Sequence, residues 1–352
     1  MDSDLEREFV SLNVNIHQAQ RIVDYHRSES VPISTFQEHT RNGYSGFTPT
    51  KTYIIVLQDQ TGYMLKVSLS APSSRMASTY APNTLATEHA LLQLLSQHTD
   101  VPHPVAHALD TSLSLLPYPY LLLSRPQGIP LSHARASGKL TQRQLLQLDL
   151  RIGTYLRQMH DRVQNDWFGL PAQAHEELYS WQEAFTGLLE GMLEQAHALG
   201  IVLPYEDVRR YLSRAIGFFL FDDCEVPSLI SFAGDEDVSF VDFDPAAPPE
   251  SEEEIQITSL LSFSHALWGD PLLETMFLNP SDALIEGYGG PLMLFARQRT
   301  KRIWYTLFLA LVVLVHTKSD EEIPGTEDSD KVKWARSTLG ECIRKLRDAP
   351  CY

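Results

Sequence analysis

The sequence has few cysteines and a shortage of basic residues, and each shortage excludes some classes of protein. Its 352 residues include only three cysteines, Cys224, Cys342 and Cys351, which are odd in number and lack metal-binding spacing. Such cysteine usage argues against a disulfide framework and fits a reducing compartment. The formal net charge of −17 leaves too little lysine and arginine for non-specific nucleic-acid binding or for docking on anionic lipid.

Long apolar runs are also missing. The longest run, residues 303–315, is well short of the roughly 20 residues that a membrane-spanning helix needs, and it is typical of a buried helix. Residues 1–15 are polar and acidic and lack the apolar centre of a signal peptide. We therefore expect a cytoplasmic protein with neither nucleic-acid nor membrane partners.

The composition and the apolar patterns of the sequence predict a globular protein with strands followed by helices. A hydrophobic content of 43% is ordinary for a folded protein with one large core or two moderate cores. Residues 52–57 and 63–68 are rich in β-branched and aromatic residues and flank a turn, so they predict two strands. Apolar spacing predicts helices within residues 5–27, 82–97, 141–160, 181–199 and 205–221, a buried helix at 303–315 and a surface helix at 331–348.

A lysine in a predicted strand and a glutamate in the next predicted helix are the first candidates for a binding site. Lys66 interrupts the apolar strand, and Glu88 lies among the apolar residues of the helix. A lone strand lysine is usually an exposed edge residue, but this combination is the ion pair that positions nucleotide phosphates in kinase folds. Upstream, Gly43 and Gly46 favour an ordinary hairpin loop over one whose amides cover phosphates.

Two later segments resemble a known family. Residues 229–242 read LISFAGDEDVSFVD, and residues 260–271 read LLSFSHALWGDP. The second resembles the Ala-Leu-Trp-Gly-Asp-Pro segment of the fungal-type branch of the aminoglycoside phosphotransferase (choline-kinase-like) family. The first occupies the place of that family's catalytic loop, His-Gly-Asp-x-x-x-x-Asn. Residues 101–131 resemble its last small-lobe strand and hinge, and residues 166–171 resemble its Phe-Gly-Leu-Pro segment.

The resemblance implies an α/β (α+β) chain with the two-lobed fold of protein kinases. A helical extension at residues 1–31, an N-lobe with an antiparallel sheet and one helix at 32–127, and a mostly helical C-lobe at 128–352 are expected. Lys66 and Glu88 would then face a nucleotide, and the hinge backbone near Ser124 and Pro126 would bind its adenine. A small-molecule ligand in the interlobe cleft and a setting in fungal secondary metabolism are also implied, and a protein partner is compatible with them.

The catalytic side chains of the family are largely absent. Phosphoryl transfer needs a carboxylate for the acceptor hydroxyl, and an Asn and an Asp that hold Mg²⁺. In the alignment, the family His, catalytic Asp, metal Asn, metal Asp and following acid fall on Ser231, Ala233, Val238, Ser262 and Ser264. Loss of a general base alone typically costs ~10²–10⁴ in rate. The first hypothesis is a pseudokinase that binds a small molecule, serves as a scaffold or runs a metal-independent reaction, with no cofactor required.

Two other hypotheses remain open. A two-residue shift of the alignment makes Asp235 the catalytic carboxylate and Asp242 or Asp244 the Mg²⁺ ligand of an active ATP-dependent O-phosphotransferase. That shift places Phe240 where the metal Asn should be, and it leaves the match over residues 266–288 unexplained. The third hypothesis keeps the Lys66–Glu88 pair only as an ion pair that stabilises the fold, without any nucleotide.

Overall fold

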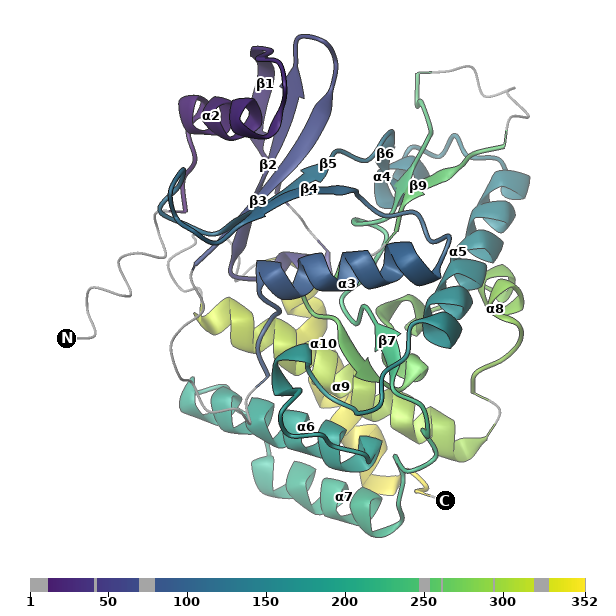
Figure 1. The fold of residues 1–352 in the computed structure, drawn as a ribbon. Helices are drawn as coiled ribbons and strands as arrows, with labels where there is room; N and C mark the ends of the chain where they lie inside the picture. The colour runs from purple at the N-terminus through teal and green to yellow at the C-terminus, as the bar shows by residue number, and fades with distance from the viewer. Residues whose placement is uncertain are drawn as a thin grey trace, which may run out of the picture.

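The chain folds into two lobes, an N-lobe built on an antiparallel sheet and a mostly helical C-lobe (Figure 1). The structure is a computed structural model that describes residues 12–40, 43–69, 80–246, 254–260, 262–293, 295–319 and 329–351. The N-lobe sheet has the order β1-β2-β3-β5-β4. Its strands are β1 (Ile33–Glu38), β2 (Thr50–Leu57), β3 (Gly62–Ser68), β4 (Ala106–Asp110) and β5 (Tyr120–Ser124).

Alternation along the strands gives the N-lobe sheet two apolar faces. The odd-numbered residues of β2 and β3, such as Ile55 and Leu65, pack with helix α2 (Ile16–His26). The even-numbered residues, such as Ile54 and Met64, pack with helix α3 (Leu85–His98) in a different apolar cluster. Side chains of a strand point alternately to opposite faces, so Lys66 must lie on the α3 side together with Met64.

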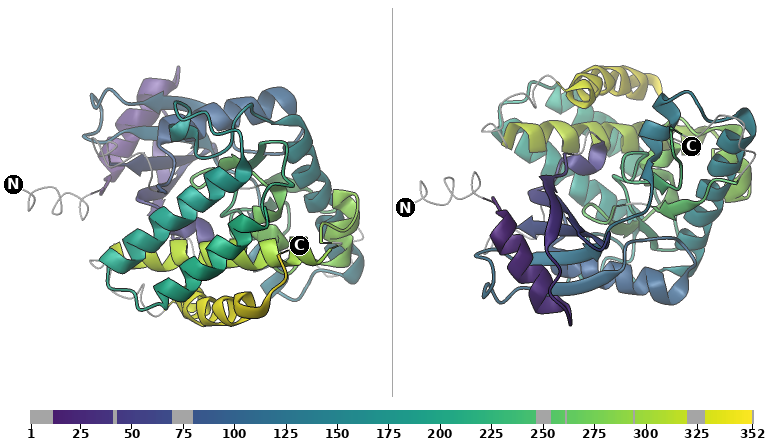
Figure 2. Two further views of the ribbon diagram at one scale, coloured as in Figure 1. Left: turned by 90° about the horizontal axis from the view of Figure 1, so that it is seen from below. Right: turned by 90° about the horizontal axis from the view of Figure 1, so that it is seen from above.

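The C-lobe is organised around its longest helix, α9 (Ala296–Ser319), which is buried for most of its length. Figure 2 (left) shows two teal helices, α6 and α7, in front of α9 and the yellow α10 beside it. The other C-lobe helices are α4 (Leu131–Ala136), α5 (Gln142–Arg162), α6 (Trp181–Ala198), α7 (Tyr205–Gly217), α8 (Asp282–Tyr288) and α10 (Asp330–Asp348). No helix in the described part of the chain combines the length and hydropathy of a membrane span.

Short strands connect the hinge to the loops beneath the N-lobe. A two-stranded sheet pairs β7 (Ser228–Ile230) with β10 (Leu267–Gly269). A three-stranded sheet has the order β6-β8-β9, formed by β6 (Ile129–Pro130), β8 (Phe240–Val241) and β9 (Ile257–Ser259). The segment between β7 and β8 is therefore held at both ends, directly below the hinge.

The two predicted strands and the predicted helices are confirmed within the described residues, with three differences. Helix α7 ends at Gly217 instead of continuing to residue 221, because the chain turns at Phe219 with φ 52° and buries Leu220. The last helix is not purely a surface helix, since it buries one apolar face, including Leu339, in the same core as α9. Residues 5–11 of the first predicted helix lie outside the described residues, and residues 12–15 are not helical, because α2 begins after its N-cap, Asn15.

The predicted hairpin loop between β1 and β2 has an unexpected structure. Residues Tyr44–Gly46 form a single 3₁₀ turn, η2, and both Tyr44 and Ser45 are buried. Tyr44 belongs to the apolar core of the C-lobe and not to that of the N-lobe. Glycines and polar residues in the sequence indicated a turn, but they could not indicate that this turn packs against the other lobe.

Candidate functional site

The Lys66–Glu88 pair lies between the lobes and is almost fully buried. Lys66 Nζ is 2.5 Å from Glu88 Oε2, and the two residues are only 3% and 4% exposed. The strand alternation turns Lys66 towards α3, and Thr84 caps that helix by accepting a hydrogen bond from Thr87 N. Glu88 therefore sits in the first turn of α3, where a negative charge is favoured by the helix dipole.

Two serines from the far end of the sequence complete this buried cluster. Ser264 Oγ lies 3.3 Å from Lys66 Nζ and 3.2 Å from Glu88 Oε1. Ser262 Oγ lies 3.3 Å from Ser264 Oγ. Within the described residues, the structure thus brings four sequence-predicted site residues together, and Ser264 contacts the ion pair with a neutral hydroxyl.

Asn83 fixes the position of the segment that contains Ser262 and Ser264, which we call the serine segment. The sequence did not identify Asn83 as a site residue. Its side-chain amide donates to the Phe263 and Ala266 carbonyls at 2.9 and 2.8 Å, and its backbone N–H donates to Ser264 O at 2.6 Å. Asn83 directly precedes the capping Thr84, so the sequence indicated a helix start there. Nothing in the sequence indicated that the same residue would hold a loop 180 residues away.

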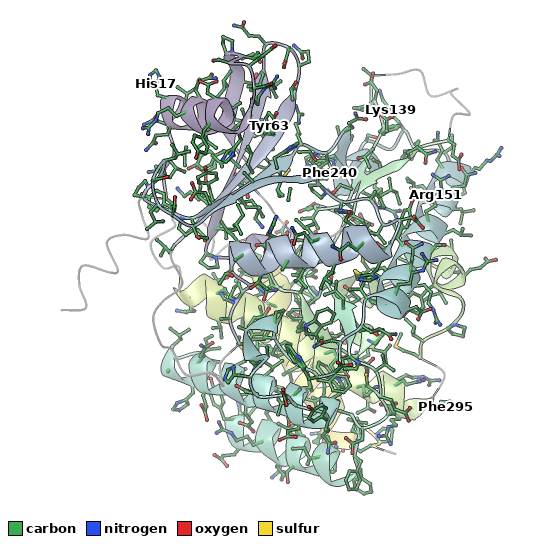
Figure 3. The ribbon with its side chains drawn as sticks, in the orientation of Figure 1. His17, Tyr63, Lys139, Arg151, Phe240 and Phe295 are labelled. Atoms are coloured by element: carbon green, nitrogen blue, oxygen red, sulfur yellow. The ribbon has the colours of Figure 1, made fainter. Side chains whose placement is uncertain are left out.

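The interlobe cleft beside this cluster is small, about 50 Å³. Its apolar walls come from both lobes and include Met64, Leu92, Leu123, Pro126, Val238 and Phe240. Its polar lining includes His39, Lys66, Glu88, Asp237, Ser259 and Ser262. Figure 3 labels Phe240 at the boundary between the lobes. Because pockets for drug-sized ligands hold roughly 300–1,000 Å³, this cleft must widen before it can accept a nucleotide.

The hinge offers little to an adenine ring. Ser124 N donates to Val105 O at 2.8 Å, and Arg125 N donates to Gly62 O at 3.0 Å. Pro126 lines the cleft but has no N–H group. The carbonyl of Gln127 accepts a hydrogen bond of 2.6 Å from the Thr258 hydroxyl. Three of the hinge backbone groups are therefore already engaged, and the N–H of Pro126 is absent.

Ser231 and Ala233 are turned into the C-lobe core. Ser231 donates to the two carboxylate oxygens of Glu274, through its N–H and its hydroxyl, each at 2.7 Å. His160 Nε2 lies 3.4 Å from the same buried carboxylate, and His160 Nδ1 lies 2.8 Å from the Tyr288 hydroxyl. Ala233 is also buried. Glu274 was not singled out from the sequence, and its position just after the Ala-Leu-Trp-Gly-Asp-Pro segment was the only available signal.

Asp235 lies partly buried beneath the β1–β2 connection. Its Oδ2 accepts a hydrogen bond from Tyr44 N at 2.7 Å, and its Oδ1 accepts one from Asp237 N at 3.0 Å. Loss of contact with water raises the pKa of this carboxyl group, and the two amide hydrogen bonds partly oppose that shift. Both carboxylate oxygens therefore have backbone partners in this conformation.

Asp242 and Asp244 are exposed and follow β8 on the hinge side of the C-lobe. Asp244 Oδ1 accepts a hydrogen bond from Ala246 N at 2.7 Å, which makes a local turn. Neither residue lines the cleft. Within the described residues, no group of three or more His, Cys, Asp or Glu side chains is arranged to hold a metal ion.

Asp270 is part of a separate buried network. It accepts hydrogen bonds from Leu272 N and from the Tyr305 hydroxyl, each at 2.9 Å, and it forms an ion pair with Lys301. Lys301 also contacts Asp223 at 2.6 Å. These contacts join the segment after β10 to α9, so Asp270 has a structural role.

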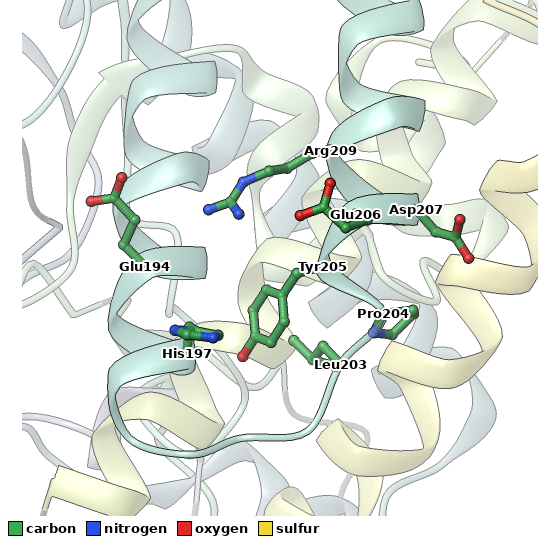
Figure 4. A pocket seen from close by; sticks show the side chains of 8 residues that line it. All are labelled: Glu194, His197, Leu203, Pro204, Tyr205, Glu206, Asp207 and Arg209. Atoms are coloured by element: carbon green, nitrogen blue, oxygen red, sulfur yellow. The ribbon is translucent and has the colours of Figure 1, made fainter.

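A larger hollow, of about 630 Å³, lies between α6 and α7 (Figure 4). Its lining includes Tyr205, His197, Glu194, Glu206 and Arg209. It is an open groove at the end of the C-lobe furthest from the N-lobe (Figure 1). It contains none of the residues that the sequence singled out, so the interlobe cleft remains the candidate site on chemical grounds.

Comparisons with known proteins agree with this architecture. The sequence profile of the phosphotransferase enzyme family (APH) matches residues 45–211, slightly under half of the chain. No curated protein sequence matches the chain significantly.

Several solved structures share the fold at low sequence identity. A proposed fructosamine-3-kinase from Haemophilus somnus 129PT has a TM-score of 0.62 and 11% identity, over 92% of this chain and 96% of that one. A proposed aminoglycoside phosphotransferase from Ralstonia eutropha JMP134 has a TM-score of 0.60 and 11% identity, over 96% and 100%. Aminoglycoside phosphotransferase APH(4)-Ia, solved as a thermostable mutant with AMP-PNP and hygromycin B, has a TM-score of 0.53 and 15% identity, over 94% and 98%.

Proposed function

We infer that the chain is a member of the phosphotransferase enzyme family, and we propose that its cleft binds a small molecule without Mg-ATP phosphoryl transfer. The family profile, the two-lobed fold and the Lys66–Glu88 pair support membership. The similar structures are named for kinases and phosphotransferases of small molecules, which supports a ligand of that size. The fungal-type branch, a role in secondary metabolism and the domain limits at residues 31 and 127 stay predictions.

The loss of phosphoryl transfer is carried by one observation, the set of side chains that face Lys66 and Glu88. Ser262 and Ser264 occupy this position and Val238 lines the cleft beside them. A hard cation such as Mg²⁺ prefers carboxylate and other oxygen ligands with strong negative charge. A neutral serine hydroxyl is a poor substitute, and an isopropyl group cannot ligate a cation at all.

The charge balance of the cleft supports the same proposal. Glu88 neutralises Lys66 at 2.5 Å, and Asp237 adds a further negative charge to the lining. A triphosphate needs local positive charge to offset its own, in a protein whose net charge is already −17. An uncharged or cationic small molecule is better matched to this lining.

The alternative hypothesis is an active O-phosphotransferase that uses Asp235 as its catalytic carboxylate, with Asp242 or Asp244 holding Mg²⁺. The retained Lys66–Glu88 pair favours it, because this pair positions phosphates in active kinases. It requires that Asp235 exchange its hydrogen bond from Tyr44 N for one from an acceptor hydroxyl. On this hypothesis, Asp235→Ala abolishes turnover.

The deciding experiment is a thermal-shift and calorimetric titration of the full chain with ATP, with and without Mg²⁺. A ligand that binds only the folded state stabilises it by about 2.7 kcal/mol at a hundred times its Kd. We expect no Mg²⁺-dependent stabilisation, and we expect Lys66→Met, which removes the phosphate-positioning charge, to give the same ATP response as the wild type.

Each result of the titration has a distinct meaning. Mg²⁺-dependent binding together with phosphate transfer that Asp235→Ala abolishes would overturn the proposal in favour of the alternative. Binding of ATP that is indifferent to Mg²⁺ would support a nucleotide site without transfer. No binding in either condition would support a small-molecule site for another ligand, and the Lys66–Glu88 pair would then serve stability alone.

A further inference from the structure

We propose that residues 43–47, which we call the clasp, close the interlobe cleft by binding the C-lobe, so that a ligand enters only when the clasp is released. The proposal concerns access to the cleft, and it rests on the proposed function only in taking that cleft as the ligand site. It is carried by three contacts between the clasp and the C-lobe.

The first contact is a close approach of the clasp backbone to Asp235. Tyr44 N donates to Asp235 Oδ2 at 2.7 Å. Gly43 packs so tightly against the same carboxylate that a Cβ atom at this position would overlap it. Asp235 cannot simply swing away, because Asp237 N holds its other oxygen at 3.0 Å. A Cβ atom at residue 43 would therefore displace the Asp235 carboxylate and disturb the approach of the clasp to the C-lobe.

The second contact is the insertion of the Tyr44 ring beside α10. The ring meets Trp334 edge-on at 5.1 Å between centroids, and Lys331 Nζ lies 3.9 Å from the centre of the Tyr44 ring. Both partners are in the first turns of α10, and the Lys331 charge also acts on Asp235. An aromatic pair and a cation–π contact are each worth about 0.5–2 kcal/mol.

The third contact joins the end of the clasp to the serine segment. Phe47 O lies 2.8 Å from His265 Nε2, and a carbonyl oxygen can only accept, so His265 carries a proton on Nε2. The other ring nitrogen, Nδ1, then accepts from the Tyr80 hydroxyl. His265 directly follows Ser264, so the clasp binds both C-lobe segments that border the ion pair.

Residues 43–47 are not part of the cleft lining, but these contacts hold the clasp beside segments that are. His39 lines the cleft shortly before the clasp, and Asp237 lines it two residues after the Asp235 anchor. Figure 2 (right) shows the short purple turn of the clasp beside the yellow-green helix α9. With the clasp bound, the cleft holds about 50 Å³, which is far too small for a metabolite. Releasing Tyr44 and Asp235 separates the lobes on this side.

The test uses a thiol reporter in the cleft and needs no ligand. Ser262→Cys introduces the reporter, in a Cys224→Ser background that removes the half-buried native thiol, while Cys342 and Cys351 are buried. The measured quantity is the rate at which a small maleimide modifies residue 262. We expect Tyr44→Ala to raise this rate about tenfold or more, because local opening exposes the reporter. Gly43→Ala should raise it by less.

Matched controls separate clasp release from general loosening. Tyr25→Ala removes a tyrosine that is 70% exposed on α2, and Gly340→Ala adds a Cβ on α10 where no atom lies within 4 Å. Neither control should change the labelling rate. Hydrogen exchange should rise at residues 43–49 in the clasp variants and stay constant in α6.

The proposal is overturned if both clasp variants keep the labelling rate of the reporter alone, or if the controls accelerate it equally. If Tyr44→Ala fails to fold, Gly43→Ala still decides, because it retains the Tyr44 ring and disturbs only the approach to Asp235. Since no nucleotide or Mg²⁺ is present, this result is independent of the ATP titration. The clasp and the loss of phosphoryl transfer can therefore fail separately.

Discussion

The two halves of the interlobe cleft present different side chains. The N-lobe half has a buried lysine–glutamate pair in the geometry that positions phosphates. The C-lobe half presents Ser262, Ser264, Val238 and the carboxylate of Asp237, whereas Asp235 lies outside the cleft lining and accepts a hydrogen bond from Tyr44 N. Within one fold, a motif that supports the framework can therefore be retained while a catalytic motif is lost.

The difference has an energetic reason. A buried ion pair that loses one partner leaves an uncompensated charge, which typically costs 3–5 kcal/mol, so the pair persists even without a nucleotide. A catalytic carboxylate at a cleft has no such support from folding, and its replacement by serine or alanine is tolerated. The Lys66–Glu88 pair alone is thus weak support for catalysis, and the C-lobe half of the cleft is the informative one.

The largest expected effect comes from removing one partner of the buried ion pair in the N-lobe half of the cleft. Lys66→Met should lower the free energy of unfolding by about 3–5 kcal/mol, because Glu88 is left buried without its charge partner. The matched control is Lys51→Met on the neighbouring strand, whose pair with Glu38 spans 3.9 Å and is exposed, so about 1 kcal/mol or less is expected. Urea unfolding of both variants measures the difference, and equal losses would contradict it.

Acidification should next weaken the C-lobe half. Burial lowers the pKa of His265 to about 3 and that of His316, 5.8 Å away between ring centroids, to about 4. The unfolded chain takes up these protons near pH 6.5, whereas the folded chain takes them up only near the lowered pKa values. The free energy of unfolding therefore has its full value above pH 6.5 and falls as the pH drops towards the folded pKa values. From pH 7 to pH 5 the expected loss is about 2 kcal/mol per histidine.

A matched variant isolates the histidine contribution. His316 Nε2 is buried and has no hydrogen-bond partner, so His316→Phe removes a titrating group without breaking a hydrogen bond of that atom. The variant should lose about half of the pH-dependent destabilisation, measured by urea unfolding at both pH values. If the variant loses as much stability between pH 7 and pH 5 as the wild type does, other groups cause the pH dependence.

A smaller effect distinguishes the two acidic candidates of the C-lobe half. Asp235→Asn should destabilise the fold by about 1–3 kcal/mol, because an amide has only one acceptor oxygen and therefore leaves either Tyr44 N or Asp237 N without its partner. Asp242→Asn, on an exposed residue, should change stability by no more than about 0.5 kcal/mol. If both variants are instead equally stable and equally inactive in phosphate transfer, the active alternative gains support.

The smallest effect concerns the helix that carries Glu88. Thr84→Ala should cost about 1 kcal/mol, because the Thr87 N–H loses its capping acceptor at the start of α3. Thr84→Ser keeps the hydroxyl and should recover most of that loss. Thermal unfolding of the two variants is sufficient, and identical melting temperatures would mean that the cap contributes nothing.

Local patterns in the sequence predicted much of the fold but few of the contacts that C-lobe residues make at the site. Alternation along β3 and helical spacing in α3 were enough to suggest that Lys66 and Glu88 face each other, since each depends on its own element. The Ser264 contact with that pair joins residues 198 positions apart, and the Glu274 contact with Ser231 joins loops of the C-lobe. Such contacts depend on how the elements pack, which no local pattern encodes.

The sequence by itself determined the order of strands and helices, the two-lobed fold and the residues that occupy each motif position, because these follow from local periodicity and from family resemblance. Only the tertiary structure decided that Asp235 accepts hydrogen bonds from backbone amides, that three hinge backbone groups are engaged and that Gly43 and Tyr44 pack against the C-lobe. The physical reason is that hydrogen bonds and close packing between distant segments exist only once the lobes have docked, and they give the same carboxylate either a chemical or a structural role.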